Sequence, residues 1–315
     1  MIADRTHLFV VGAPRSGTTW LHSMLADHPA VASLKVELTL FSHYLAPGAA
    51  RFEEESLRSE QGHWHQGLPQ LFTQAEFDEG LRTAAEAVYQ RVLGTNPEST
   101  HILDKHPGYS RHIPLIARLM PKSRFIHIIR DGREVAVSMM SAKRRLGYGA
   151  GEIQGAAREW HGNICHARSA GVTLGPARYM EVRYEYLVEH TATALGEVFE
   201  FSGLKVQKDE TERIANENNI SRKQVSRGDV QLNTLRAIPD AIWKAKLSLE
   251  ERWIMEQMVG HLLKELGYAR SSDWWALHSG DKLRMAGYPL FRKLGNTIGS
   301  TLHTWRKPLV KRIDP

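Results

Sequence analysis

The sequence predicts an α/β fold in which a central parallel sheet is flanked by helices. Short β-rich segments alternate with segments of helical periodicity, and a turn follows several of the β-rich segments. Such alternation is typical of parallel crossovers, in which ligands gather at the carboxyl ends of the strands. The 315-residue chain has 42% hydrophobic and 24% charged residues. This average composition excludes disorder, collagen and coiled coil as descriptions of the whole chain.

Four short segments are predicted to be strands because apolar and β-branched residues are concentrated in them. They are His7 to Val11, His101 to Asp104, Arg124 to Ile129 and Tyr179 to Arg183. The third segment, Arg-Phe-Ile-His-Ile-Ile, has the strongest pattern of the four and is expected to be a central strand.

Apolar residues at helical spacing predict helices between and after these strands. The predicted helices are a first one from Thr18 that ends at His28-Pro29, then Ala75 to Leu93, Arg111 to Met120, Arg133 to Leu146, Thr191 to Ser202 and Leu249 to Leu266. The segment Arg51 to Gly67 has no clear period and is predicted to be a long loop over the site. We expect a main domain of residues 1–268 and a basic, aromatic extension of residues 269–315.

The excess of positive charge is confined to the C-terminal end of the chain. The formal net charge is +6, and Asp281 to Pro315 holds eight basic and two acidic residues. A nucleic-acid-binding protein would not confine its excess to one end, so no nucleic-acid partner is expected. The extension could contact a membrane surface, or pack on its own domain or on the second subunit of a homodimer.

Cysteine content and hydropathy bear on the compartment. Cys165 is the only cysteine, so neither an intramolecular disulfide nor a cysteine-based metal cluster can form. The first residues are unlike a signal peptide, and no apolar stretch approaches the roughly 18 residues that span a bilayer. A cytoplasmic location is expected.

A glycine-rich turn follows the first predicted strand. Gly12 to Thr19 reads Gly-Ala-Pro-Arg-Ser-Gly-Thr-Thr, with the G-x-x-x-x-G spacing of a phosphate loop. Thr18 stands where nucleoside triphosphatases carry a lysine for the β and γ phosphates, whereas Arg15 supplies a cation earlier in the turn. Backbone N–H groups and hydroxyls at the helix start predict an anion site. The alternative is a glycine turn with a Ser or Thr cap.

This turn resembles the donor loop of the sulfotransferases that use 3′-phosphoadenosine 5′-phosphosulfate (PAPS). Their loop reads Pro-Arg/Lys-Ser-Gly-Thr-Thr after a first strand, as Pro14 to Thr19 does here. The resemblance implies a P-loop-like three-layer fold, PAPS as donor and 3′,5′-bisphosphoadenosine (PAP) as product. It also implies that Arg15 balances charge on the sulfuryl group, and that the following residues bind the 5′-phosphate: Ser16, Gly17, Thr18 and Thr19.

A second block resembles the 3′-phosphate motif of the same family. There, an arginine at a strand end and a serine eight positions later bind that phosphate, and Arg130 and Ser138 take these positions here. An arginine suits the role because guanidinium can form two parallel hydrogen bonds with phosphate.

Three aromatic residues are weaker candidates for contact with the nucleotide. Tyr184 resembles a family tyrosine near the adenine, but it could equally be a core residue. Trp20 could stack on the adenine or pack the first helix. Trp243, followed by Lys244 and Lys246, resembles a late segment that closes over the donor.

Transfer to an acceptor hydroxyl also needs a base. The segment Lys35 to Phe41 resembles a family segment with a glutamate just before aromatic residues, which makes Glu37 the candidate base, and the apolar neighbours of Glu37 predict its partial burial. The alternative bases are His106 and His43. Lys105 resembles a family lysine that supports the sulfuryl group.

The function expected from these motifs is in-line transfer of a sulfuryl group from PAPS to a hydroxyl, without a metal. Arg15 and the Asp104-Lys105-His106-Pro107 segment resemble tyrosylprotein and bacterial carbohydrate or lipid sulfotransferases more than the small-phenol enzymes. The acceptor could be a small molecule, glycan, lipid or tyrosine, with Trp64 and its neighbouring histidines as candidate lining. The alternatives are an atypical P-loop small-molecule kinase and a non-catalytic binding module.

Overall fold

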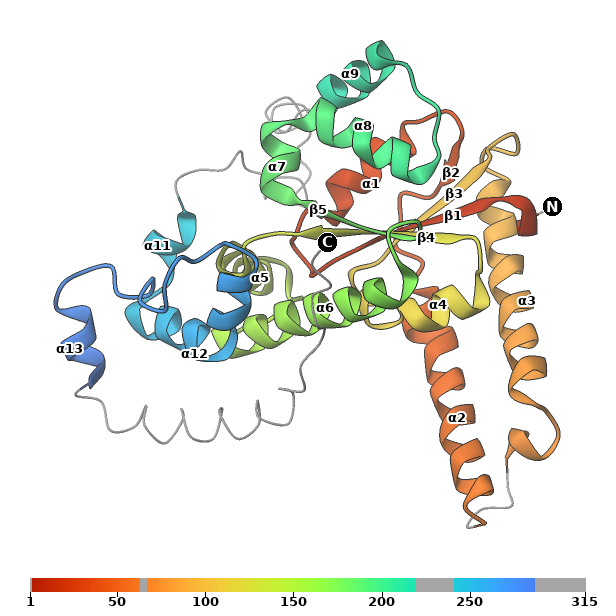
Figure 1. Cartoon of the computed structure of the whole chain (residues 1–315), viewed down its shortest axis with the longest axis horizontal. Helices are drawn as coiled ribbons and strands as arrows, with labels where there is room; N and C mark the ends of the chain where they lie inside the picture. The colour runs from red at the N-terminus through yellow and green to blue at the C-terminus, as the bar shows by residue number, and fades with distance from the viewer. Residues whose placement is uncertain (1, 63–66, 219–240, 287–315) are drawn as a thin grey trace, which may run out of the picture. The chain divides into compact units, whose positions relative to one another are not determined.

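The computed structural model describes residues 2–62, 67–218 and 241–286 (Figure 1). Within it the chain divides into two compact units. The first comprises Met1–Ala13, Gly17–Ile129 and His166–Ala237, and the second comprises Pro14–Ser16, Arg130–Cys165 and Ile238–Pro315. The candidate acceptor-site residue Trp64 and the extension after residue 286 lie outside the described residues.

The first unit contains a five-stranded sheet with the order β2-β3-β1-β4-β5 (Figure 1). Its strands are β1 (Thr6–Val11), β2 (Val31–Ser33), β3 (His101–Lys105), β4 (Ser123–Ile129) and β5 (Tyr179–Arg183). Every neighbouring pair is parallel. The predicted parallel sheet is therefore confirmed, with the four predicted strands within one residue at each end. The short strand β2 was not predicted.

Alternating side chains of β1 place an apolar core on each face of the sheet. Leu8 and Val10 point into one core, and Phe9 and Val11 point into the other. The first core is completed by α1 (Thr18–Ala26), α7 (Tyr184–Glu189), α8 (Thr191–Ser202) and α9 (Lys208–Glu217). The second is completed by η2 (Leu40–Leu45), α3 (Gln74–Leu93), η4 (Pro107–Arg111), α4 (Ile113–Leu119) and the last part of α6 (Ile153–Leu174). Helices on both faces give this unit three layers.

The segment predicted to be a loop at residues 51–67 is mostly a helix, so that prediction was wrong. Helix α2 (Ala46–Glu60) runs beside α3, and the two extend together away from the sheet (Figure 1). Ion pairs at i,i+4 spacing, such as Arg51 with Glu55 at 2.6 Å, stabilise it. Phe52 stacks on Phe77 of α3, with ring centroids 4.1 Å apart. Beyond α2 lies the short helix η3 (Leu68–Gln70).

The second unit contains α5 and α12, and the side chain of Arg133 contacts several of its segments. Its helices are α5 (Gly132–Leu146), the first part of α6, α11 (Ile242–Lys246), α12 (Leu249–Glu265) and α13 (Asp281–Ala286). The Arg133 guanidinium pairs with Asp131 at 2.7 Å and lies 4.3 Å from the ring centre of Trp243 and 4.8 Å from that of Trp274. Arg133 Nη2 also donates a 2.5 Å bond to the Tyr268 carbonyl, so a hydrogen bond and two cation–π contacts tie α5 to the later segments.

The described part of the predicted extension packs on its own unit. Asp281 is buried, pairs with Arg252 of α12 at 3.4 Å and accepts hydrogen bonds from the N–H groups of Leu277 and His278. Of the alternatives left open by the sequence, packing on its own domain therefore holds for residues 269–286.

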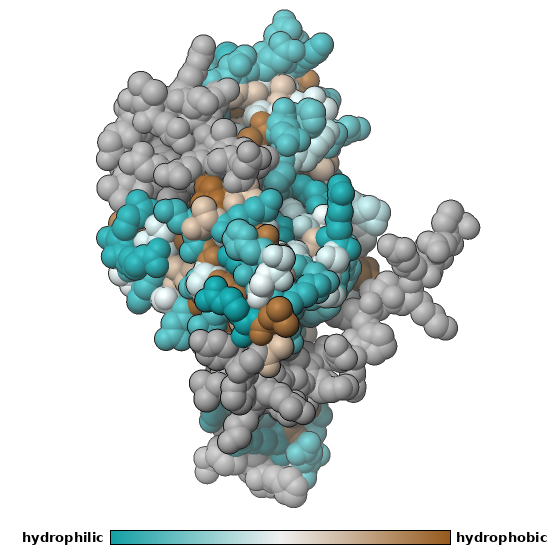
Figure 2. Space-filling model, turned by 90° about the vertical axis from the view of Figure 1, so that its left-hand side faces the viewer, coloured by the Kyte–Doolittle hydropathy of each residue, from teal (hydrophilic) through white to brown (hydrophobic). Residues whose placement is uncertain are grey.

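Surface polarity is mixed on the face drawn in Figure 2. Its described residues are mainly hydrophilic, with hydrophobic residues interspersed. None of the described helices combines the length and the apolarity that a membrane span requires.

The conformation of Gly17 at the start of α1 leads us to expect that a larger residue there lowers the free energy of unfolding. Gly17 has φ +99°, and a Cβ there would lie 2.6 Å from Cδ2 of the buried Tyr184. We expect Gly17→Ala to lower the free energy of unfolding by about 3 kcal/mol, through backbone strain and overpacking. Gly175→Ala is the matched control, because Gly175 also has positive φ but open space around it. It should cost about 1 kcal/mol in the same urea titration; equal losses in both variants would contradict the steric account.

Candidate functional site

The two motifs that the sequence assigned to anion binding meet within the second unit. Arg15 Nε donates a hydrogen bond of 3.2 Å to Ser138 Oγ, across 123 positions of sequence. Arg130 Nη1 donates a bond of 3.2 Å to the Arg15 carbonyl. The loop cation, the strand-end arginine and the helix serine therefore form one cluster.

Arg15 has an unfavourable backbone conformation and an unfavourable electrostatic environment. Its φ of +71° is in the left-handed region, which is unfavourable for a residue with a side chain. Burial lowers the pKa of Arg15, and the positive charges of Arg130 and Arg145 lower it further, against an opposing effect of Tyr148. Strain of this kind persists only where the surroundings hold it, here through the bonds to Ser138 and Arg130.

Ser16 provides a test of whether this cluster fits a phosphorylated ligand. Its side chain is fully buried, and none of the described residues gives its Oγ a hydrogen-bond partner. Buried hydroxyls are nearly always hydrogen-bonded in native proteins. An anionic oxygen bound beside Arg15 would satisfy this hydroxyl, so the residues present fit a phosphate- or sulfate-bearing donor.

Arg130 is held by two contacts that the sequence did not reveal. Its carbonyl accepts a 3.0 Å bond from Trp160 Nε1, and its guanidinium lies 4.0 Å from the carboxylate of Glu134. Glu134 also accepts a 3.1 Å bond from the Trp243 N–H. Burial raises the pKa of Glu134, while this N–H and Arg130 act in the opposite direction. The i,i+4 spacing of Arg130 and Glu134 was the available sequence signal.

Trp243 is buried rather than open to a ligand. It is 3% exposed, with the Arg133 guanidinium over its ring and Trp274 at its edge, 5.1 Å away between ring centroids. The contacts of its ring therefore support a packing role, in place of the donor contact suggested by the family resemblance.

A second group of candidate residues lies in the first unit. Lys105 Nζ forms an ion pair with Glu37 Oε1 and donates a 3.1 Å bond to Thr19 Oγ1. His106 Nε2 lies 3.7 Å from the other oxygen of Glu37. The Glu37 side chain is 40% exposed. It is therefore less buried than its apolar neighbours in the sequence predicted.

Buried polar contacts fix the end of β3, where Lys105 stands. Asp104 accepts bonds from the hydroxyls of Tyr89 at 2.9 Å and Tyr109 at 3.1 Å, and from the Lys105 N–H at 2.7 Å. Burial raises the pKa of Asp104, and these three donors counteract that rise. Because β3 pairs with β1, the same edge carries the start of the glycine loop, where the Gly12 N–H donates to Ser110 Oγ at 3.0 Å.

Two predicted nucleotide contacts are core residues. Trp20 and Tyr184 are each 1% exposed, and their rings meet edge to face with centroids 6.1 Å apart. Trp20 Nε1 donates a 2.9 Å bond to the Asn218 carbonyl. Burial leaves neither ring a free face for adenine, so the packing alternatives hold and the prediction of nucleotide contact is corrected. Thr18 is also buried, whereas Thr19 is exposed.

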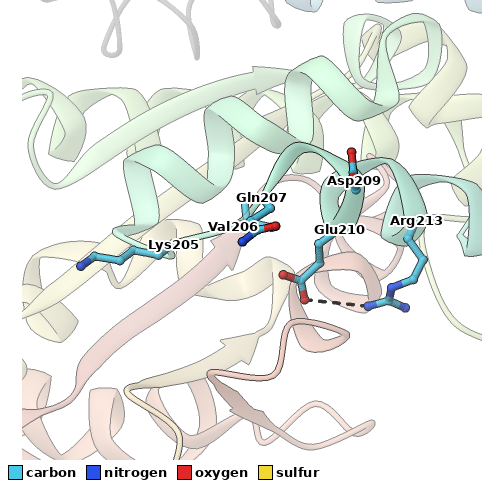
Figure 3. Close-up of a pocket in the computed structure, with 6 residues that line it drawn as sticks. All are labelled: Lys205, Val206, Gln207, Asp209, Glu210 and Arg213. Atoms are coloured by element: carbon cyan, nitrogen blue, oxygen red, sulfur yellow. Dashed lines mark ion pairs between the residues drawn. The ribbon is translucent and has the colours of Figure 1, made fainter.

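A cavity of about 550 Å³ lies elsewhere in the first unit, beside the start of α9 (Figure 3). It is lined by Lys205, Val206, Gln207, Asp209, Glu210 and Arg213, and Glu210 pairs with Arg213 at 3.9 Å. None of these residues belongs to the motifs. We therefore assign the cavity no part in the candidate chemistry.

Several of the relatives found by comparison are named protein-tyrosine sulfotransferases. Protein-tyrosine sulfotransferase 2 of Gallus gallus is 27% identical over 201 residues, which cover 62% of this chain and 51% of that protein. Protein-tyrosine sulfotransferase A of Caenorhabditis elegans is 22% identical over 268 residues, covering 83% and 67%. The chain thus spans about half to two thirds of the length of these two relatives.

A solved structure shares the fold. The mouse sulfotransferase SULT7A1, complexed with PAP, superimposes with a TM-score of 0.54 at 14% identity, over 86% of this chain and 89% of that one. The sequence model of the sulfotransferase family matches residues 7–208. These residues include both anion motifs, the Glu37 segment, strands β2 to β5 and all of β1 except Thr6. The chain belongs to the sulfotransferase family.

Proposed function

We propose that this protein transfers a sulfuryl group from PAPS to a hydroxyl of an acceptor. The observation that carries the proposal is the 3.2 Å hydrogen bond from Arg15 Nε to Ser138 Oγ. It brings together one motif assigned to the sulfuryl and 5′-phosphate end of the donor and another assigned to its 3′-phosphate. A nucleotide with phosphates at both its 3′ and its 5′ position is the ligand that would use both motifs.

The second unit supplies the cations for this donor. Arg15 and Ser16 would bind the end of PAPS that carries the transferable sulfuryl group, and Arg130 with Ser138 would bind the 3′-phosphate. PAPS supplies an activated sulfuryl group when bound. Guanidinium groups in a buried setting stabilise spread negative charge more strongly than they would in water, which supports our proposal that the reaction needs no metal.

Glu37 and Lys105 are the groups that we propose for the acceptor hydroxyl. Glu37 would accept the hydroxyl proton, and Lys105, paired with Glu37 and bonded to Thr19, would place a positive charge beside the developing anion. His106 Nε2 lies 3.7 Å from Glu37 Oε2, a position that suits a partner of Glu37 better than a replacement for it.

A kinase is less favoured than sulfuryl transfer. Thr18 is buried and stands where a phosphate-loop kinase carries its lysine. The family match also covers the Arg130 motif, which a kinase acting on ATP would not need.

For the acceptor we propose a hydroxyl compound. The relatives named protein-tyrosine sulfotransferases support a tyrosine side chain within that class. We keep residues 1–268 as the proposed transferase domain and residues 269–315 as an extension to it. A membrane contact of that extension, a homodimer and a cytoplasmic location remain predictions from the sequence.

Removal of the loop cation tests the function. With labelled PAPS and a panel of phenolic, sugar and lipid hydroxyl compounds, the native protein should transfer the label to at least one compound. Arg15→Ala should lower kcat about 100-fold or more while the fold is retained, because a half-buried charge that stabilises the reacting group is lost. The matched control is Arg158→Ala, which removes an exposed arginine from α6. Equal activity of Arg15→Ala and the control would refute the role of Arg15.

A second substitution tests the base. Glu37→Gln keeps the size of the side chain and removes its ability to accept a proton. We expect kcat to fall about 100-fold or more, with PAP binding unchanged in calorimetry. Glu98→Gln, at an exposed glutamate of the same unit, should leave both quantities unchanged. Full turnover in Glu37→Gln would assign the proton to another group.

A further inference from the structure

A chain of polar groups leads away from Glu37 within the first unit. His106 Nε2 lies 3.7 Å from Glu37 Oε2, and His106 Nδ1 lies 3.3 Å from Ser42 Oγ. His43 Nδ1 contacts the same hydroxyl at 3.0 Å. The other carboxylate oxygen, Oε1, pairs with Lys105. The two oxygens of Glu37 thus face different partners, a permanent cation and an imidazole that can take up a proton.

The contacts of Ser42 determine which nitrogen of His106 carries the hydrogen. Ser42 Oγ lies 3.2 Å from the Thr39 carbonyl, which can only accept, so the hydroxyl donates there. The hydroxyl has one hydrogen, and its remaining capacity is to accept. The arrangement that satisfies all three contacts therefore has His106 and His43 donating from Nδ1–H to Ser42. This tautomer leaves His106 Nε2 with a lone pair directed to Glu37.

A lone pair and a carboxylate oxygen repel each other until a proton lies between them, and Glu37 brings such a proton when it accepts one from the acceptor hydroxyl. We propose that His106 is the proton-accepting partner of Glu37, taking at Nε2 the proton that Glu37 removes from the acceptor hydroxyl. This inference rests on the proposed function and deepens it. The separation of 3.7 Å exceeds a direct hydrogen bond, and catalytic contacts of this kind commonly shorten only when substrate is bound.

The proton balance is simple. The hydroxyl O–H bond breaks as its oxygen forms the bond to sulfur, the bond from sulfur to the bridging oxygen of PAPS breaks and releases PAP, and Glu37 becomes neutral by taking the proton. Transfer to Nε2 restores the Glu37 carboxylate and leaves His106 as an imidazolium, which releases the proton to solvent. Glu37 is thereby an anion again, able to pair with Lys105 and ready for another turnover.

The charges around His106 suit this role. Burial lowers the pKa of His106, the Glu37 carboxylate raises it, and His43 and Lys105 lower it further. His112 also lies close enough to interact with His106 electrostatically. The net direction is downward, so His106 is neutral near pH 7 and its Nε2 is available to accept a proton.

Kinetics provide one test. We expect His106→Gln to lower kcat about tenfold or more with PAP affinity unchanged. In the native protein, turnover should be lost as the pH falls below the ordinary histidine value of about 6.5 and His106 becomes protonated. His106→Gln should lack that loss. His112→Gln, which removes a neighbouring imidazole that no described contact joins to Glu37 or Ser42, should keep the native kcat and pH profile. A native pH profile in His106→Gln would overturn the proposal.

Nuclear magnetic resonance provides a test that needs no turnover. In protein with labelled histidine, the His106 signal is assigned by its absence in His106→Gln. The nitrogen shifts should show the Nδ1–H tautomer, and Glu37→Gln should lower the pKa of His106 by removing the charge that raises it. An Nε2–H tautomer, or a His106 titration that Glu37→Gln does not change, would contradict the pairing.

The two tests separate this inference from the proposed function. If the protein transfers sulfuryl groups but neither the pH profile nor the His106 titration depends on the pair, the inference fails and the function stands. If no transfer from PAPS is found while the His106 titration shifts as expected, the pairing stands and the function fails.

Discussion

The concentration of positive charge around Arg15 is the feature that most constrains which ligand the protein can bind. A half-buried arginine with a second arginine bonded to its carbonyl, and a third near enough to lower its pKa, is costly for a protein to maintain. Glu134 offsets part of that cost at Arg130. Binding of an anion would remove much of the remaining electrostatic cost. The cluster should therefore strongly favour negatively charged ligands.

The parallel sheet explains why polar turns that are distant in sequence follow neighbouring strands. Strands β3, β1 and β4 are neighbours, and each ends beside a polar turn. Lys105 closes β3, the glycine loop follows β1, and Arg130 follows β4. Buried bonds to Asp104 and from Trp160 then hold these ends in place. Catalytic groups placed on such supported ends lose little freedom when a ligand binds.

Much of this could be predicted from the sequence, and the failures have identifiable causes. The strands were readable because both faces of the sheet are buried, which leaves short apolar runs such as that in β4. Helix α2 was missed because it buries few apolar residues and depends instead on i,i+4 ion pairs. Strand β2 has only three residues, too few for any pattern.

The site shows the same division. Arg15, Arg130 and Ser138 could be singled out because motifs of fixed spacing carry them, whereas the choice between packing and nucleotide contact for Trp20 and Tyr184 stayed open because a motif does not report burial. The roles of Glu134 and Ser42 depend on contacts with other parts of the chain, Trp243 in one case and His106 in the other. Such contacts become visible only in three dimensions.

Calorimetric titration of the native protein with PAP and with ATP, each with and without magnesium, tests whether the cluster around Arg15 binds a nucleotide with two separate phosphate groups. Two separate phosphate sites predict that PAP binds about 100-fold more tightly than ATP, because one charge-assisted contact set is worth about 1.5–3 kcal/mol, and that magnesium makes no difference. Tighter binding of ATP that depends on magnesium would contradict the account.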